Sequence, residues 1–199
     1  RARTRCPARQ VAGLPAAVDD LLDANQITFL RRADRHDLRD VPLEDVATAL
    51  HDTIGKSGRE ITPDALEVAT QATGGYPFMI QLVGYHTWRC ASGATIDRAA
   101  VATGVDAARV RLGSLVHAPA LRELSDVDRT FLLAMARDEG PSRTSTIAER
   151  MEKSTQYASV YRARLMAAGM IEPAGHGTVR FSIPYLREYL VEHAAHQAL

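Results

Sequence analysis

The chain has few cysteines, few aromatic residues and no long apolar run, and each of these features excludes some classes of protein. Cys6 and Cys90 are its two cysteines; they lie far apart and form no Cys-x-x-Cys motif, which fits a reducing cytoplasm best. Aromatic residues make up 6% of the 199 residues, which favours helices packed through Ala, Leu and Val. No apolar run approaches the ~20 residues that span a bilayer. We therefore expect a cytoplasmic protein without a membrane partner.

An excess of charge of one sign is also absent, because 24 basic and 24 acidic residues cancel. Any affinity for nucleic acid must therefore come from a local patch. Residues 1–9 carry four arginines and no acid; we expect a frayed or truncated end there rather than a nucleic-acid arm. The chain begins with Arg1 rather than Met, so we expect a fragment of a longer protein.

Residues 43–116 show a helical period and no strand alternation. One apolar stripe consists of Leu43, Val46, Ala47, Leu50 and Ile54. Thr62 and Pro63 are typical of an N-cap and a first helical position, and that helix should end at Gly74-Gly75. Further helices are predicted over 76–91 and 96–115. The sequence thus predicts a helical domain over residues 41–118.

The last third of the chain predicts a winged helix-turn-helix with a small β-hairpin, over residues 119–199. Ser125-x-x-Asp128 resembles a capping box for a helix over 126–137, followed by a turn over 139–142. A short helix over 144–151 and a longer helix over 155–168, capped by Ser154, come next. Two strands, 170–172 and 178–183, flank Gly175-His176-Gly177. Pro184 should open a last helix, and Pro119 should interrupt the helical pattern at the domain boundary near residues 117–124. The expected fold class is mainly α.

The helix over 155–168 is the main functional signal, because it combines a buried face with a polar face. The buried stripe consists of Ala158, Tyr161, Leu165 and Ala168. Residues 142–181 hold six basic residues against three acidic ones. Polar and cationic side chains of this kind hydrogen-bond phosphates and base edges. The predicted contacts to duplex DNA are Arg143, Lys153, Thr155, Gln156, Ser159, Arg162, His176 and Arg180. The alternative is a winged helix that packs on protein partners.

No segment makes a convincing catalytic or metal site. Ile54-Gly55-Lys56-Ser57 resembles a P-loop ending, but Leu50 stands where the loop needs its first glycine, and an amphipathic helix precedes it instead of a strand. His193 and His196 lack a neighbouring ligand set, so no metal is expected. Residues 76–88 fit a hydrophobic core better than a cofactor pocket. Arg31 and Arg32 precede Asp34, which fits either a solvated, self-paired charge run or guanidinium groups offered to a neighbouring subunit's nucleotide.

The order of these parts resembles the back half of AAA+ ATPases of the origin-recognition (ORC/Cdc-type) branch, and most closely the bacterial ORC-like predicted ATPases. The segments that carry this resemblance are Ala12-Gly13-Leu14-Pro15, Phe29-Leu30-Arg31-Arg32-Ala33, Leu38 through Pro42-Leu43, Thr73-Gly74-Gly75-Tyr76-Pro77-Phe78-Met79-Ile80-Gln81 with Trp88, Ile147-Ala148, and Leu165 through Gly169-Met170-Ile171. The resemblance spans nearly the whole chain.

This resemblance implies an ATP-dependent switch, with a lid that senses nucleotide and a winged helix that engages DNA. Residues 1–40 would be a remnant of the nucleotide-binding core, with Arg31 or Arg32 in the arginine-finger region. The Walker A and Walker B segments, which hold ATP and Mg, would lie upstream of Arg1, and the missing core would mediate self-association. The fragment alone should therefore use no cofactor and hydrolyse no ATP.

The family's sensor-2 arginine is expected near the start of the third lid helix, where this chain has Tyr76 and Pro77 and no arginine. Any nucleotide sensing would therefore fall to these two residues. Three functional hypotheses remain: the DNA-binding part of an ORC-like ATPase, a signalling NTPase whose winged helix contacts proteins, and an autonomous transcription factor. The third leaves the helical domain over residues 43–116 unexplained.

Overall fold

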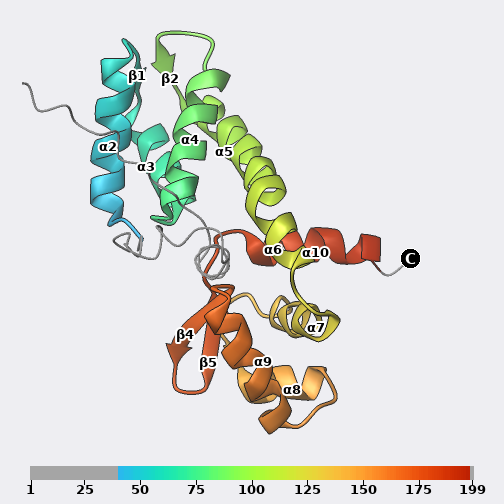
Figure 1. Ribbon diagram of the computed structural model, residues 1–199. Helices are drawn as coiled ribbons and strands as arrows, with labels where there is room; N and C mark the ends of the chain where they lie inside the picture. Colours follow the sequence, from blue (N-terminus) through green and yellow to red (C-terminus); the bar gives the residue numbers. More distant parts are fainter. Residues whose placement is uncertain (1–39, 198–199) are drawn as a thin grey trace, which may run out of the picture.

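The computed structural model describes residues 40–197, which form a mainly helical structure with two small sheets (Figure 1). The fold class predicted from the sequence is confirmed. The helices are α2 (Leu43–Lys56), α3 (Pro63–Thr73), α4 (Pro77–Cys90), α5 (Arg98–Leu112), the π-helical turn η2 (Gly113–His117), α6 (Ala118–Arg122), α7 (Asp126–Met135), α8 (Thr144–Arg150), α9 (Thr155–Ala167) and α10 (Leu186–Gln197). The strands are β1 (Glu60–Ile61), β2 (Thr95–Ile96), β3 (Ser142–Arg143), β4 (Ile171–Gly175) and β5 (Thr178–Phe181).

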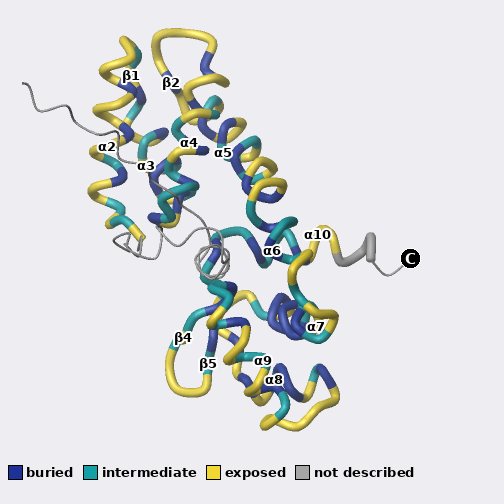
Figure 2. Tube along the Cα trace, viewed as in Figure 1, coloured by how far each residue is buried: buried dark blue, intermediate teal, exposed yellow. Residues whose placement is uncertain are grey.

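Buried apolar residues form two clusters, one in the bundle of α2 to α5 and one around α7 to α10 (Figure 2). In the bundle, α4 and α5 approach most closely at Gly104. A Cβ atom there would lie 2.6 Å from the Cα atom of Thr87, so a side chain at this position has no room. The small residue therefore sets the spacing of the two helices.

The bundle also contains a parallel pair of strands that the sequence did not predict. Glu60 pairs with Thr95 and Ile61 with Ile96, and both isoleucine side chains are buried. Each strand has two residues, which is too short to show the alternation that marks a strand in sequence. The prediction of a purely helical segment was therefore wrong at these positions.

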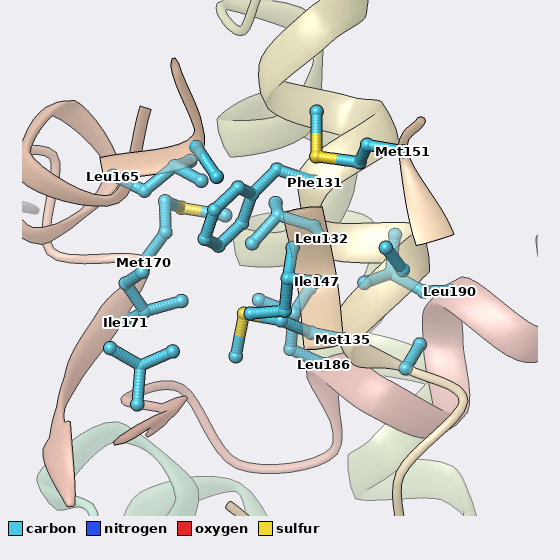
Figure 3. Packing of buried hydrophobic residues seen from close by; sticks show 14 of the residues in the cluster. Phe131, Leu132, Met135, Ile147, Met151, Leu165, Met170, Ile171, Leu186 and Leu190 are labelled. Carbon is cyan, nitrogen blue, oxygen red and sulfur yellow. The ribbon is translucent and has the colours of Figure 1, made fainter. Parts of the chain in front are cut away.

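The second cluster lies in a winged-helix arrangement, in which α7, β3, α8 and α9 are followed by the β4–β5 hairpin. The strands form an antiparallel sheet in the order β3-β5-β4. Phe131 and Leu132 from α7, Ile147 from α8 and Leu165 from α9 are fully buried against one another (Figure 3). The sequence predicted a turn at Ser142, because serine is common in turns. In the structure Ser142 begins β3, and its buried hydroxyl donates to a carboxylate oxygen of Asp138.

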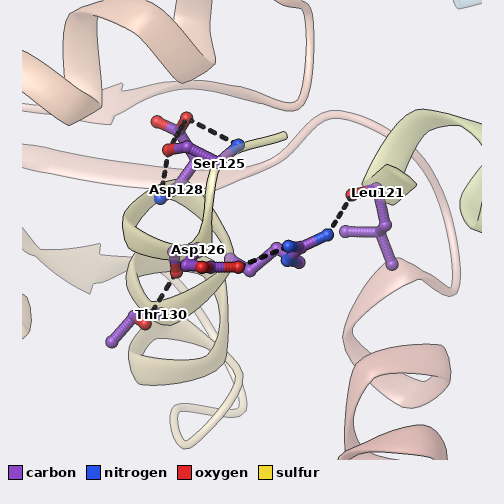
Figure 4. A network of polar contacts seen from close by, with 6 residues as sticks. Leu121, Ser125, Asp126, Asp128 and Thr130 are labelled. Atoms are coloured by element: carbon purple, nitrogen blue, oxygen red, sulfur yellow. Dashed lines mark hydrogen bonds and ion pairs between the residues drawn. The ribbon is translucent and has the colours of Figure 1, made fainter. Parts of the chain in front are cut away.

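Side-chain caps define several helix ends as predicted. Ser125 and Asp128 form a reciprocal capping box at α7 (Figure 4), and the Ser154 hydroxyl accepts from the backbone N–H of Tyr157 at α9. Gly74 ends α3 in the left-handed conformation, with φ of 57°. Thr62 occupies the N-cap position of α3, but its hydroxyl donates to Asp64 at 2.6 Å and leaves the backbone uncapped.

The helical path continues across the predicted boundary, so the expected interruption at Pro119 was wrong. The π-helical turn η2 joins α5 to α6, and the N–H of Ala118 donates to the carbonyl of Gly113. Pro119 then falls in the first turn of α6, where a missing N–H costs little. Residues 113–122 therefore connect the two clusters without a loop.

His117 lies at this connection, where its side chain is 1% exposed. Its Nε2 atom lies 3.0 Å from the carbonyl oxygen of Pro184, and its ring meets Tyr189 edge-on. The pKa of His117 is lowered to about 4, chiefly because burial removes water from the charged form; the Pro184 carbonyl and Glu188 act in the opposite direction. The imidazole is thus held neutral between the clusters.

Tyr185 forms a second contact between the two clusters. Its hydroxyl donates to the carbonyl of Ala72 at 2.8 Å, and the guanidinium of Arg109 lies 4.7 Å from its ring centroid. The backbone of Tyr185 has a φ of 59°, which a residue other than glycine rarely adopts. Because of this turn, α10 begins at Leu186 and not at Pro184 as predicted.

We expect Gly104→Ala to lower the free energy of unfolding by roughly 1–3 kcal/mol, because the new methyl group would push α5 away from α4. Urea unfolding followed by circular dichroism measures the change. Gly55→Ala is the matched control: it also lies in a helix, but no atom lies within 4 Å of the added Cβ. Equal effects of the two substitutions would show that the close approach is not what limits position 104.

We expect stability to fall as the pH is lowered from about 6.5 to about 4, by up to about 3 kcal/mol from His117. Since the pKa of His117 is depressed in the folded state, the unfolded state binds a proton in this window that the folded state does not. Urea unfolding at several pH values measures the slope. His117→Asn has no imidazole to titrate, and a slope as steep as that of the unmodified chain would contradict the assignment.

Candidate nucleic-acid interface

The α9 helix buries one side and exposes another. Ala158 and Leu165 are buried, and Tyr161 packs partly against the same cluster. Thr155, Gln156 and Ser159 are exposed in the structure. The Ser159 hydroxyl donates to the carbonyl of Thr155 at 2.8 Å, which leaves its lone pairs free to accept from a ligand. The predicted polar face is therefore accessible.

The predicted cations near α9 divide into free and paired groups. Arg143 and Lys153 are exposed and form no ion pair with any described residue. Arg162 is half-buried, and its Nε atom is buried without a hydrogen-bond partner among residues 40–197. Arg180 is exposed, but it lies 2.5 Å from a carboxylate oxygen of Glu172 on the neighbouring strand. Lys153, just before α9, and Arg143, on β3 next to the turn of the wing, thus have no carboxylate partner among the described residues.

Two further arginines of this region contact acidic residues of α7 and of the turn after it. Arg150 on α8 lies 2.5 Å from Asp138, and this hydrogen bond lowers the pKa of the Asp138 carboxyl. Arg164 on α9 lies 3.1 Å from Asp128, which is 2% exposed, and its guanidinium lies 5.4 Å from the ring centroid of Tyr161. These contacts tie α8 and α9 to the preceding segment rather than providing charge for a ligand.

The pairing of Asp128 with Arg164 was not predicted from the sequence. Asp128 was recognised as a capping residue, and it does cap α7. Its second role depends on a residue 36 positions away in the chain, and helical periodicity carries no information about contacts between helices. The sequence showed only an acidic residue in the first turn of one helix and arginines on another, which does not identify the pair.

The β4–β5 hairpin, which forms the wing, is bonded to the start of α8. Thr144 donates to the carbonyl of Gly177 through both its backbone N–H, at 3.0 Å, and its hydroxyl, at 3.2 Å. Arg143 pairs in register with Thr178, two residues beyond His176. Arg143 and the exposed His176 therefore belong to the same end of the sheet.

The other predicted site residues lie apart from this surface. Tyr76 is half-buried and packs against both apolar clusters, and its pKa is raised by burial and then by Asp40. Pro77 begins α4 directly after it. Arg31 and Arg32 lie outside the described residues. Gly55 and Lys56 end α2, and a turn follows, as expected for a segment that is not a P-loop.

Residues 40–197 contain no group of three or more His, Cys, Asp or Glu side chains that could hold a metal ion. None of the helices in this part of the chain is long and apolar enough to cross a bilayer.

One segment of the chain is similar to a family whose role is not described. Residues 114–190 match the family described as "Domain of unknown function (DUF8462)"; these residues run from η2 into α10 and include the whole winged-helix arrangement. No curated protein matches the chain. The matched family describes less than half of the chain and leaves its activity open.

Among solved structures, a lysine-to-arginine variant of RuvB from Thermotoga maritima is similar to 78% of this chain, with a TM-score of 0.38 and 16% identity. The match covers 50% of the RuvB chain, so this chain spans about half the length of that protein.

Proposed function

We propose that this chain binds duplex DNA through α9 and the wing, as the lid and winged-helix part of an ORC-like AAA+ ATPase. The observation that carries the proposal is the exposed polar face of α9, which Lys153 precedes in the chain. Arg143 on β3 is a second exposed cation, and neither residue has a carboxylate partner among residues 40–197. Polar side chains on one helix face read base edges, and free cations bind phosphates. Control by an upstream site for ATP and Mg, and self-association through the upstream core, follow from the resemblance alone.

The accessible residues suit different parts of a duplex. Thr155, Gln156 and Ser159 offer hydrogen-bonding groups of the kind that base edges accept. Lys153, just before α9, and Arg143, beside the turn of the wing, would offer charge to phosphates. The ion pair of Arg150 with Asp138 holds α8, and that of Arg164 with Asp128 holds α9. The polar face of α9 is therefore ordered before a ligand binds.

The second candidate is a regulatory NTPase whose winged helix binds a protein. Val160 favours it, because this apolar side chain is 56% exposed on α9, between Gln156 and Ala163. A protein partner would cover Val160, whereas in a major groove the same side chain would meet thymine methyl groups. The salt dependence of binding separates the two candidates.

We expect Lys153→Ala and Arg143→Ala each to weaken binding to a random duplex and to lower the slope of log K against log salt by about one unit. Each substitution removes one phosphate contact. Gel shifts or fluorescence anisotropy over a salt series measure the slope, and Arg111→Ala, an exposed arginine on α5, serves as the control. A folded protein without duplex binding at low salt would exclude the DNA assignment and favour protein contact.

We expect Glu172→Gln to strengthen duplex binding several-fold, because it removes the carboxylate that neutralises Arg180. Glu149→Gln removes one exposed negative charge from α8 without releasing an arginine, so it controls for the change in net charge. The gain should disappear when Arg180→Ala is combined with Glu172→Gln. Equal gains from the two glutamine variants would contradict a role for Arg180.

A further inference from the structure

The α4 helix exposes two aromatic side chains at a surface that none of the predicted contacts includes. Tyr85 is 54% exposed and Trp88 is 41% exposed. Arg89 lies beside them on α4, and Lys56 and Arg59 come from the end of α2 and the segment before β1. We call these five residues the aromatic–basic surface. The C-terminal ends of α2 and α4, next to β1 and β2, lie at the end of the helical bundle that points away from α8 and α9 (Figure 1).

Trp88 is held in place by the segment that follows α2. Its indole N–H donates to the hydroxyl of Ser57 at 3.0 Å, and the Arg59 guanidinium lies 4.4 Å from its ring centroid. Arg59 is itself fixed, since Nη1 donates to the carbonyls of Trp88 at 2.5 Å and Ala91 at 3.1 Å. An exposed ring that is already ordered loses little conformational entropy when a planar ligand stacks on it.

Tyr85 and Arg89 form a similar pair one helical turn apart. Nη1 of Arg89 donates to the Tyr85 hydroxyl at 2.7 Å, and the guanidinium lies 5.5 Å from the ring centroid. His86 meets the same ring edge-on at 5.1 Å. The second aromatic side chain is thus also oriented by its neighbours while more than half of it remains exposed.

The described residues provide no carboxylate partner for the positive charge of this surface. Lys56, Arg59 and Arg89 form no ion pair with a carboxylate of residues 40–197. The two arginines donate instead to neutral carbonyl and hydroxyl groups. Asp52, the acidic residue of the last turns of α2, lies 3.4 Å from His51. Three cations therefore attract an anion here without a competing carboxylate partner.

We propose that the aromatic–basic surface binds single-stranded nucleic acid, independently of the α9 surface. Binding of single strands combines cations that hold the backbone with aromatic rings on which successive bases stack. A duplex hides the faces of its bases, so exposed rings would add nothing to duplex binding. Trp, Tyr and Arg are also enriched at protein interfaces, but the three cations without carboxylate partners favour a polyanion, and a protein partner becomes an outcome of the test.

Trp88 makes the proposal directly testable, because it is the single tryptophan of the chain. Titration of the full chain with oligo(dT) at low salt should quench its fluorescence in a saturable manner, since a stacked base contacts the indole. Tyr85→Ala should weaken this binding on the order of tenfold, while the Trp88 reporter is retained. Lys56→Ala should lower the affinity and the salt dependence. Inorganic polyphosphate, a polyanion without bases, should compete weakly.

The controls separate this surface from the α9 surface. The double variant Lys153→Ala/Arg143→Ala should leave the quenching of Trp88 by oligo(dT) unchanged, even if it no longer binds duplex DNA. Loss of duplex binding can therefore be distinguished from loss of single-strand binding. Absence of saturable quenching, with the protein folded by circular dichroism, would overturn the proposal and leave protein contact as the role of this surface. Competition by polyphosphate as strong as by oligo(dT) would also overturn it, because charge alone would then explain binding.

Discussion

The packing of residues 184–189 against the helical path from α5 to α6 determines how the two halves of this protein are joined. His117 contacts the Pro184 carbonyl, Tyr189 lies against that ring, and Tyr185 reaches the end of α3. A Cβ atom on Gly113 would lie 3.0 Å from the Tyr189 ring, so the path needs a small residue there. Because η2 continues α5 into α6, the bundle and the winged-helix arrangement share a helical connection rather than a flexible linker.

This connection leaves two chemically different surfaces uncovered. The α9 face carries hydroxyl and amide groups, whereas the aromatic–basic surface carries two ordered aromatic rings and three cations without carboxylate partners among residues 40–197. Neither surface is a concave pocket, and each suits an extended polyanion better than a small substrate.

Ion pairs decide how much of the basic composition is available to a ligand. Residues 142–181 hold six basic residues, but Arg150, Arg164 and Arg180 each face a carboxylate. The first two pairs anchor α8 and α9, and the third neutralises part of the wing. Counting charges along the sequence therefore overstates the positive charge that a duplex would meet at the winged helix. It also misses Lys56, Arg59 and Arg89, which have no carboxylate partner among residues 40–197.

The sequence by itself determined most of the helices, several of their caps and the polar face of α9, because these features depend on neighbours within a few residues. Ser125, Ser154 and Gly74 act as predicted, and Thr155 and Ser159 are exposed. Only the tertiary structure decided the β1–β2 pair, the β3 strand, the continuous path through Pro119 and the pairing of Asp128 with Arg164. Each of these depends on a contact between segments distant in the chain or on a π-helical turn without a local signal. The pairing of Trp88 with Arg59 and of Tyr85 with Arg89, which places rings and cations together, was likewise visible only in three dimensions.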